Sequence, residues 1–145
     1  MMKFYGVLVL TIIIAIGCFV SWTNSQNKLQ GTSENEIWEA EYKNEKIGGS
    51  SIGWKVSVQQ RNKEELTVKK LLFLEDDKKI FEQIKFQNGI DIDGTKYSLH
   101  PFSYPNLYFG DAPKDNVDYT IEIVWVDQSG NEHTDKIELK KRDIF

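Results

Sequence analysis

Apolar side chains follow two patterns along this chain. Residues 4–22 form an unbroken run without a charge, whereas residues 36–140 alternate apolar and polar side chains in short segments. As a helix, the run would be about 28 Å long, close to the roughly 30 Å hydrocarbon core of a bilayer. Short alternating segments indicate half-buried β-strands. The two patterns predict one N-terminal hydrophobic helix followed by an all-β domain.

The N-terminal run predicts that the protein lies at the cell membrane, with residues 4–22 as the contact. Lys3 precedes the run, and beyond it the first charge, Lys28, is soon followed by Glu34 and Glu36. This asymmetry favours a single-pass protein with a cytoplasmic N-terminus and the C-terminal domain outside. The expected organisation is a membrane anchor or signal segment (1–22), a polar spacer (23–35) and an extracytoplasmic β domain (36–145).

Two cleaved forms of the run remain alternatives to an uncleaved signal-anchor helix. The segment AIGC at 15–18 resembles the lipobox of bacterial lipoproteins. Those proteins are cut before the cysteine and carry lipid on it, so Cys18 is a candidate lipidation site and a lipid anchor there is the alternative localisation. Ala15 and Gly17 are also small residues of the kind that precede an ordinary secretory cleavage site.

The β domain contains several segments of regular alternation. Residues 37–43 form the first, with Trp38 on its apolar face. Trp54 and Trp125 lie on the two clearest apolar faces, so we expect these last two rings in one core. Residues 66–74 are more apolar, and a bulge near Lys69 explains their change of phase. Residues 79–86 fit both a helical stripe and a strand face. Their shortness and the Asn-Gly pair that follows favour a strand.

These segments predict an immunoglobulin-like antiparallel sandwich of about seven strands. The order of short strands ending in a Tyr-containing hairpin resembles an immunoglobulin-like domain, although the cysteine pair of true immunoglobulin domains is absent. The whole chain also resembles small uncharacterised membrane-anchored or lipoprotein-type proteins of Gram-positive bacteria. That resemblance rests on EIWEAEY at 36–42 and YTIEIVW at 119–125. It implies no activity and assigns no functional residue.

Composition and motifs exclude several classes of function. The formal net charge of −4 provides no basic footprint for nucleic acid. No phosphate loop, zinc-protease pattern or Gly-x-Ser-x-Gly motif is present. We therefore expect no cofactor, no metal and no enzyme activity, with a hydrolase of unrecognised site as the last alternative. His100 and His133, the two histidines, are expected at the surface.

Aromatic residues concentrate in residues 97–109, where Pro101 and Pro105 predict a loop. Exposed rings in a loop can stack on sugar faces or receive a proline-rich peptide, whereas buried rings would cap the core. The sequence therefore predicts a non-catalytic binding or interaction domain for an envelope protein, or for a cell-wall sugar or peptide. The candidate ligand-binding residues are Tyr97, Phe102, Tyr104, Tyr108 and Phe109.

Overall fold

The computed structural model describes residues 2–26 and 28–141, without the side chains of residues 2–5, 19–26 and 47. This part of the chain forms one helix and ten strands. The elements are α1 (Met2–Gln26), β1 (Leu29–Thr32), β2 (Trp38–Ile47), β3 (Ser50–Gln60), β4 (Thr67–Glu75), β5 (Lys78–Gln83), β6 (Gly89–Ile90), β7 (Lys96–Leu99), β8 (Phe102–Gly110), β9 (Tyr119–Val126) and β10 (Glu132–Lys141).

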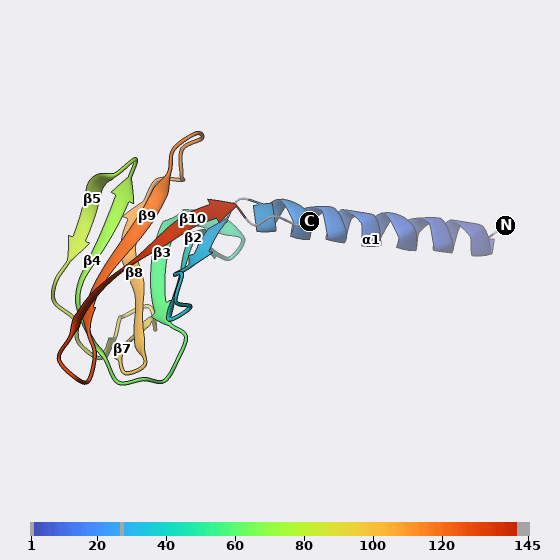
Figure 1. Cartoon of the computed structure of the whole chain (residues 1–145). Coiled ribbons are helices and arrows are strands. Elements are labelled where there is room, and N and C mark those ends of the chain that lie inside the picture. Colours follow the sequence, from blue (N-terminus) through green and yellow to red (C-terminus); the bar gives the residue numbers. More distant parts are fainter. Residues whose placement is uncertain (1, 27, 142–145) are drawn as a thin grey trace.

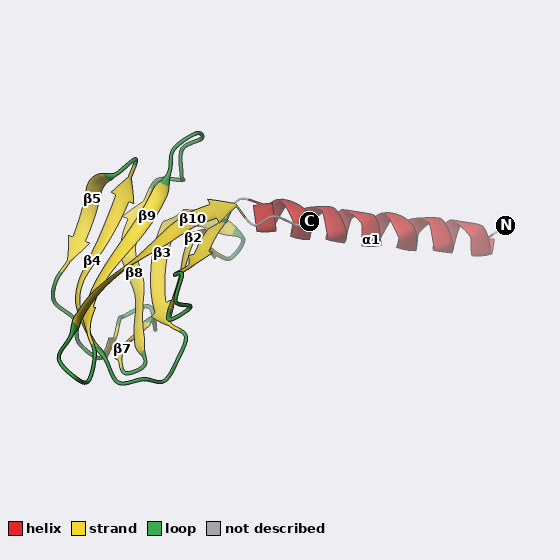
Figure 2. Ribbon diagram, viewed as in Figure 1, coloured by secondary structure: helices red, strands yellow, loops and turns green. Residues whose placement is uncertain are grey.

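The strands form one antiparallel sheet in the order β5-β4-β9-β10-β1-β2-β3-β8-β7-β6. The sheet curls into a half-barrel, so β8 packs across the interior against β4 and β5 (Figures 1 and 2). The all-β prediction is confirmed. The predicted sandwich of about seven strands differs from this arrangement because β1 hydrogen-bonds to both β10 and β2. This strand joins two groups of strands into one continuous sheet.

The predicted membrane localisation is wrong. α1 projects away from the sheet (Figure 1), and no helix within the described residues is long and apolar enough to cross a membrane. Side chains of α1 are described for residues 6–18, so the ends of the predicted run, 4–5 and 19–22, lie outside the described side chains. The alternative lipid anchor has no support beyond the exposure of Cys18.

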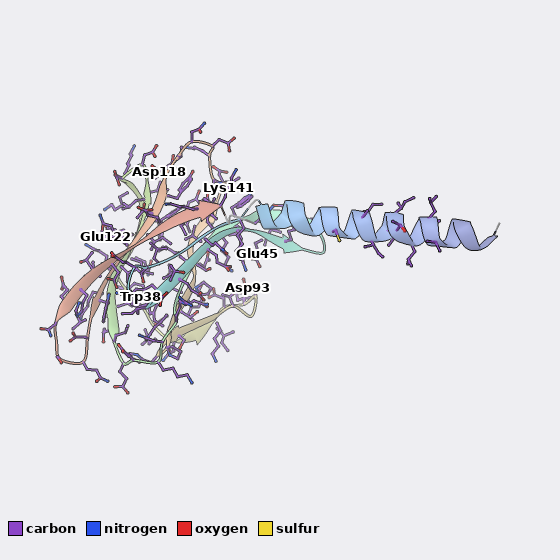
Figure 3. The ribbon with its side chains drawn as sticks, turned by 45° about the vertical axis from the view of Figure 1, so that its right-hand side comes forward. Trp38, Glu45, Asp93, Asp118, Glu122 and Lys141 are labelled. Atoms are coloured by element: carbon purple, nitrogen blue, oxygen red, sulfur yellow. The ribbon has the colours of Figure 1, made fainter. Side chains whose placement is uncertain are left out.

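The core includes the apolar faces predicted for two of the alternating segments. Trp38, Ala40 and Tyr42 of β2 are all buried, and so is every second residue of β9 from Tyr119 to Trp125. Figure 3 shows Trp38 among the side chains packed inside the curled sheet. Alternation on β2 and β9 therefore predicts the two inward faces correctly.

Trp54 departs from the expected core. Trp125 is buried with 5% of its surface exposed, whereas Trp54 is only half-buried, edge-on to Tyr42. Trp54 pairs with Gly110, the last residue of β8, so the neighbouring strand ends beside it. The prediction of two buried tryptophans is thus confirmed for Trp125 alone.

Two segments expected to be irregular contain regular elements. Residues 23–35 were expected to be a spacer, but they contain the end of α1 and the whole of β1. Residues 97–109 were expected to be a loop, but they form most of the β7–β8 hairpin. Two other expectations hold: β5 is a strand, and the register of β4 with β9 shifts between Val68 and Lys70.

Gly31 on β1 allows a close approach of two strands. A Cβ added there would lie 2.2 Å from the backbone oxygen of Glu138 and 2.8 Å from Cγ2 of Ile137. A backbone oxygen cannot move aside without displacing β10. Gly31→Ala should therefore lower the free energy of unfolding by about 1–3 kcal/mol, as measured by urea denaturation. Gln30→Ala, on the same strand, should change it by less than about 0.5 kcal/mol. Equal stability of both variants would disprove the close contact.

Candidate functional site

The five candidate aromatic residues divide between the core and the surface. Phe102 is buried and packs edge-on against Trp38, with ring centroids 5.9 Å apart. Tyr108 is half-buried and packs edge-on against Tyr42, with centroids 6.0 Å apart. Both rings therefore support the core, as the core-cap alternative expected.

Phe109 is 51% exposed, but its ring covers a glycine. A Cβ built on Gly53 would lie 2.8 Å from Cζ of Phe109. The backbone of Gly53 has a φ of 142°, which side chains rarely tolerate. This exposed ring thus compensates for a missing side chain on β3 and lies apart from the other candidates.

Tyr97 and Tyr104 contribute to a hollow of about 480 Å³, here named the tyrosine hollow. The register of β7 with β8 pairs Ser98 with Ser103, so the two tyrosines follow as the next cross-strand neighbours. A third ring, Phe86, comes from the segment after β5. The tyrosine hollow is lined by Gln83, Lys85, Phe86, Gln87, Gly89, Ile90, Asp91, Tyr97 and Tyr104.

The three rings of the tyrosine hollow stand at steep angles to one another. Tyr97 and Tyr104 have centroids 5.2 Å apart at 64°, and Phe86 and Tyr104 have centroids 5.5 Å apart at 88°. Phe86 also packs edge-on against the buried Phe102 at 5.4 Å. The hollow therefore rests on the core through Phe86, which fixes the position of its aromatic wall.

Asp91 sets the electrostatics of the tyrosine hollow. Burial, followed by a hydrogen bond to Asp91 and its charge, raises the pKa of Tyr97 to about 12, although a hydrogen bond with Asn106 opposes the rise. Burial and the charge of Asp91 also raise the pKa of Tyr104. Both phenols are therefore neutral at pH 7 and can donate as well as accept hydrogen bonds.

The turn between β6 and β7 holds Asp91 in place. The backbone N–H of Asp91 donates to the oxygen of Thr95 at 2.8 Å, and that of Gly94 donates to the oxygen of Asp91 at 2.9 Å. The backbone N–H of Thr95 donates to Oδ1 of Asp93 at 2.9 Å. Figure 3 shows Asp93 at the tip of this turn. The Asp93 carboxylate therefore serves turn geometry, and no metal-binding group occurs among the residues described.

A second hollow of about 370 Å³ is also lined by Phe86. We name it the basic hollow. Its floor includes three buried apolar side chains, and Lys85 and Phe86 line both hollows. The basic hollow is lined by Leu66, Thr67, Val68, Lys69, Ile84, Lys85, Phe86, Leu99, His100 and Phe102.

The two histidines have different surroundings. His100 is exposed and lines the basic hollow. His133 is half-buried, and its ring stacks on Trp125 with centroids 4.3 Å apart. Its Nε2 lies 2.8 Å from Oδ2 of Asp127, and this hydrogen bond lowers the pKa of the Asp127 carboxyl. His100 is therefore a surface residue, as expected, whereas His133 is half-buried in contact with Trp125 and Asp127.

Sequence reasoning missed Phe86 and Asp91. Phe86 lies in the segment where helical and strand patterns conflicted, and Asn88 beside it was expected to form a hairpin turn. Instead, Oδ1 of Asn88 accepts the backbone N–H of Leu99 at 2.8 Å, which ties this segment to β7. One local sign of a packed ring was present in the sequence: Phe86 is apolar and comes shortly before the turn-forming pair Asn88-Gly89.

Comparison with protein-family models, curated proteins and solved structures gave no match.

Proposed function

We propose that the β domain is a non-catalytic binding module that holds a short sugar chain in the tyrosine hollow. We also propose that its scaffold is a variant of the immunoglobulin-like sandwich in which β1 connects the two groups of strands. The observation that carries the binding proposal is the meeting of three aromatic rings with amide and carboxylate side chains in one hollow.

The chemistry of the tyrosine hollow matches that of a sugar ring. A sugar presents C–H groups on its faces, which pack against aromatic rings, and hydroxyl groups around its edge. Gln83, Gln87 and Asp91 supply donors and acceptors for such hydroxyls, and the neutral phenols of Tyr97 and Tyr104 add more. The volume of about 480 Å³ lies within the usual range for a small-ligand site.

A protein-interaction module is the second candidate, favoured by the free edge strand β5. Ile80 and Phe81 of this strand are 42% and 41% exposed, and an open edge can pair with a strand of a partner. However, the register of β5 with β4 shifts at Ile80, and Lys78 and Lys79 begin the strand. Bulges and lysines are common devices that prevent edge pairing. The tyrosine hollow therefore provides the stronger basis.

Titration calorimetry on the full chain tests the proposal, with chitotetraose and maltotetraose as the sugar probes. At least one sugar should bind saturably, and Tyr104→Ala should weaken that binding about tenfold or more, because aromatic contacts often dominate small interfaces. Phe109→Ala is the matched control, since its ring lies on the same strand but outside the hollow. It should leave the affinity unchanged.

Thermal melts of both variants accompany the titrations, so that loss of folding is not mistaken for loss of binding. Absence of saturable binding by both sugars would contradict the proposal. So would equal weakening by Tyr104→Ala and Phe109→Ala. Binding of a proline-rich peptide in place of either sugar would favour the interaction module instead.

A further inference from the structure

The basic hollow combines an apolar floor with positively charged side chains at its rim. Leu66, Val68 and Phe102 form the floor, with 3%, 8% and 2% of their surface exposed. Ile84, 61% exposed, forms an outer wall. The hollow therefore offers apolar contact to a ligand that can enter from solvent.

Three basic residues line this hollow: Lys69, Lys85 and His100. None of the other described residues that line it carries a negative charge. Within the described chain, no carboxylate forms an ion pair with either lysine side chain. This concentration of positive charge contrasts with the formal net charge of −4 of the whole protein.

A backbone irregularity places one of these charges at the hollow. The register of β4 with β9 shifts between Val68 and Lys70, so Lys69 is the extra residue of a bulge. Regular alternation would send Lys69 and Val68 to opposite faces of the sheet. A bulge redirects side chains, and here Lys69 and Val68 line the same hollow.

We propose that the basic hollow binds a small organic anion with an apolar body, such as an aliphatic or aromatic carboxylate. The apolar body would lie on Leu66, Val68 and Phe102, and the anionic group would lie near Lys69 and Lys85. A neutral apolar ligand would gain the first contact without the second. An inorganic anion would gain only the weak attraction of solvent-exposed charges. The combination therefore selects an amphiphilic anion.

This site is separate from the proposed sugar site, although Lys85 and Phe86 line both. Of the two hollows, Lys69 lines only the basic hollow. Replacing Lys69 should therefore change anion binding without changing the binding of chitotetraose or maltotetraose. The two proposals can fail independently.

The experiment compares two anions with their neutral counterparts on the full-length protein, by ligand-observed NMR titration. The pairs are octanoate with 1-octanol, and N-acetylphenylalanine with N-acetylphenylalaninamide. At least one anion should bind about fivefold more tightly than its neutral partner, and added NaCl should reduce this preference because the charges lie at the surface. The tighter anion distinguishes an acyl chain from a peptide C-terminus as the source of the carboxylate.

Variants locate the binding. Lys69→Gln should weaken the binding of the preferred anion. Lys69→Gln/Lys85→Gln should bind the anion and its neutral partner equally. Ile84→Ser, at an exposed position, should weaken the binding of the anion and of its neutral partner to the same extent. Lys136→Gln, an exposed lysine on β10, is the matched control and should have no effect.

Four results would each overturn the proposal. Two concern the wild-type protein: equal binding of anions and neutral partners, or no saturable anion binding up to about 10 mM. The third is an unchanged anion preference in Lys69→Gln/Lys85→Gln when thermal melts show that the variant is folded. The fourth is the same decrease of anion binding in Lys136→Gln, because the charge effect would then not be local.

Discussion

Replacing Tyr42 with alanine should lower the free energy of unfolding by about 3–5 kcal/mol, the usual cost of removing a large buried ring. Tyr42 is 2% exposed, and its ring meets four other rings edge-on with centroids 5.4–6.0 Å away. These rings come from β3, β4, β8 and β9, so one side chain connects both sides of the curled sheet. They are Trp54, Phe73, Tyr108 and Tyr119.

Tyr42→Phe is the control that separates the ring from its hydroxyl. The phenol O–H donates to the backbone oxygen of Asp111, and burial raises the pKa of Tyr42 above its ordinary value. Losing this one hydrogen bond should cost about 0.5–1.5 kcal/mol in urea unfolding. If Tyr42→Ala were no less stable than Tyr42→Phe, the ring cluster would not be the centre of the core.

Asp135→Ala should cause the second large decrease in the free energy of unfolding, about 2–5 kcal/mol. Oδ2 of Asp135 accepts three hydrogen bonds: from Nε1 of Trp125 at 2.7 Å, from Nε1 of Trp38 at 3.0 Å and from Nδ2 of Asn35 at 2.9 Å. Both indoles are buried, and a buried donor without a partner costs about 1–3 kcal/mol. The carboxylate therefore joins β2, β9 and β10 at one point.

Two further variants test this assignment by chemical denaturation. Asp135→Asn keeps an accepting oxygen but loses the negative charge, so its cost should be smaller than that of Asp135→Ala. Thr134→Ala, an exposed neighbour on the same strand, should cost less than about 0.5 kcal/mol. Equal effects of Asp135→Ala and Thr134→Ala would show that the indole hydrogen bonds contribute little.

The sequence predicts those strands whose side chains alternate between core and solvent. On β2 and β9 the apolar positions recur at every second residue, and the structure buries them. The bulge on β4 is also predictable, because it changes the phase of an apolar pattern. In β1, by contrast, only Leu29 is buried. That strand is held by backbone hydrogen bonds on both sides, and these leave no apolar signature.

Proline misled the prediction for β8. Pro105 argued for a loop because it cannot donate to a strand ladder. In the structure, the register between β3 and β8 shifts over this stretch: Val58 pairs with Tyr104, and Val56 pairs with Tyr108. The missing N–H of proline is tolerated at such an irregularity. Tyr97 and Tyr104, two of the predicted aromatic residues, therefore line the tyrosine hollow, but they do so from strands and not from a loop.

The remaining wall of the tyrosine hollow could not be predicted from local patterns. Phe86 reaches Tyr104 only because the segment after β5 returns to the β7–β8 hairpin, through contacts such as that of Asn88 with Leu99. Asp91 acts on Tyr97 through the fold of a neighbouring turn. Such contacts depend on sheet order, which strand patterns alone do not determine.

The most direct test of the central claim, sugar binding in the tyrosine hollow, is a chemical-shift map of the isotope-labelled full chain titrated with chitotetraose and then with maltotetraose. Binding in the tyrosine hollow should give saturable shifts for the ring and backbone signals of Phe86, Asp91, Tyr97 and Tyr104. The signals of Gly53 and Phe109, which lie outside the hollow, should not shift. Shifts confined to Gly53 and Phe109, or no saturable shift with either sugar, would contradict it.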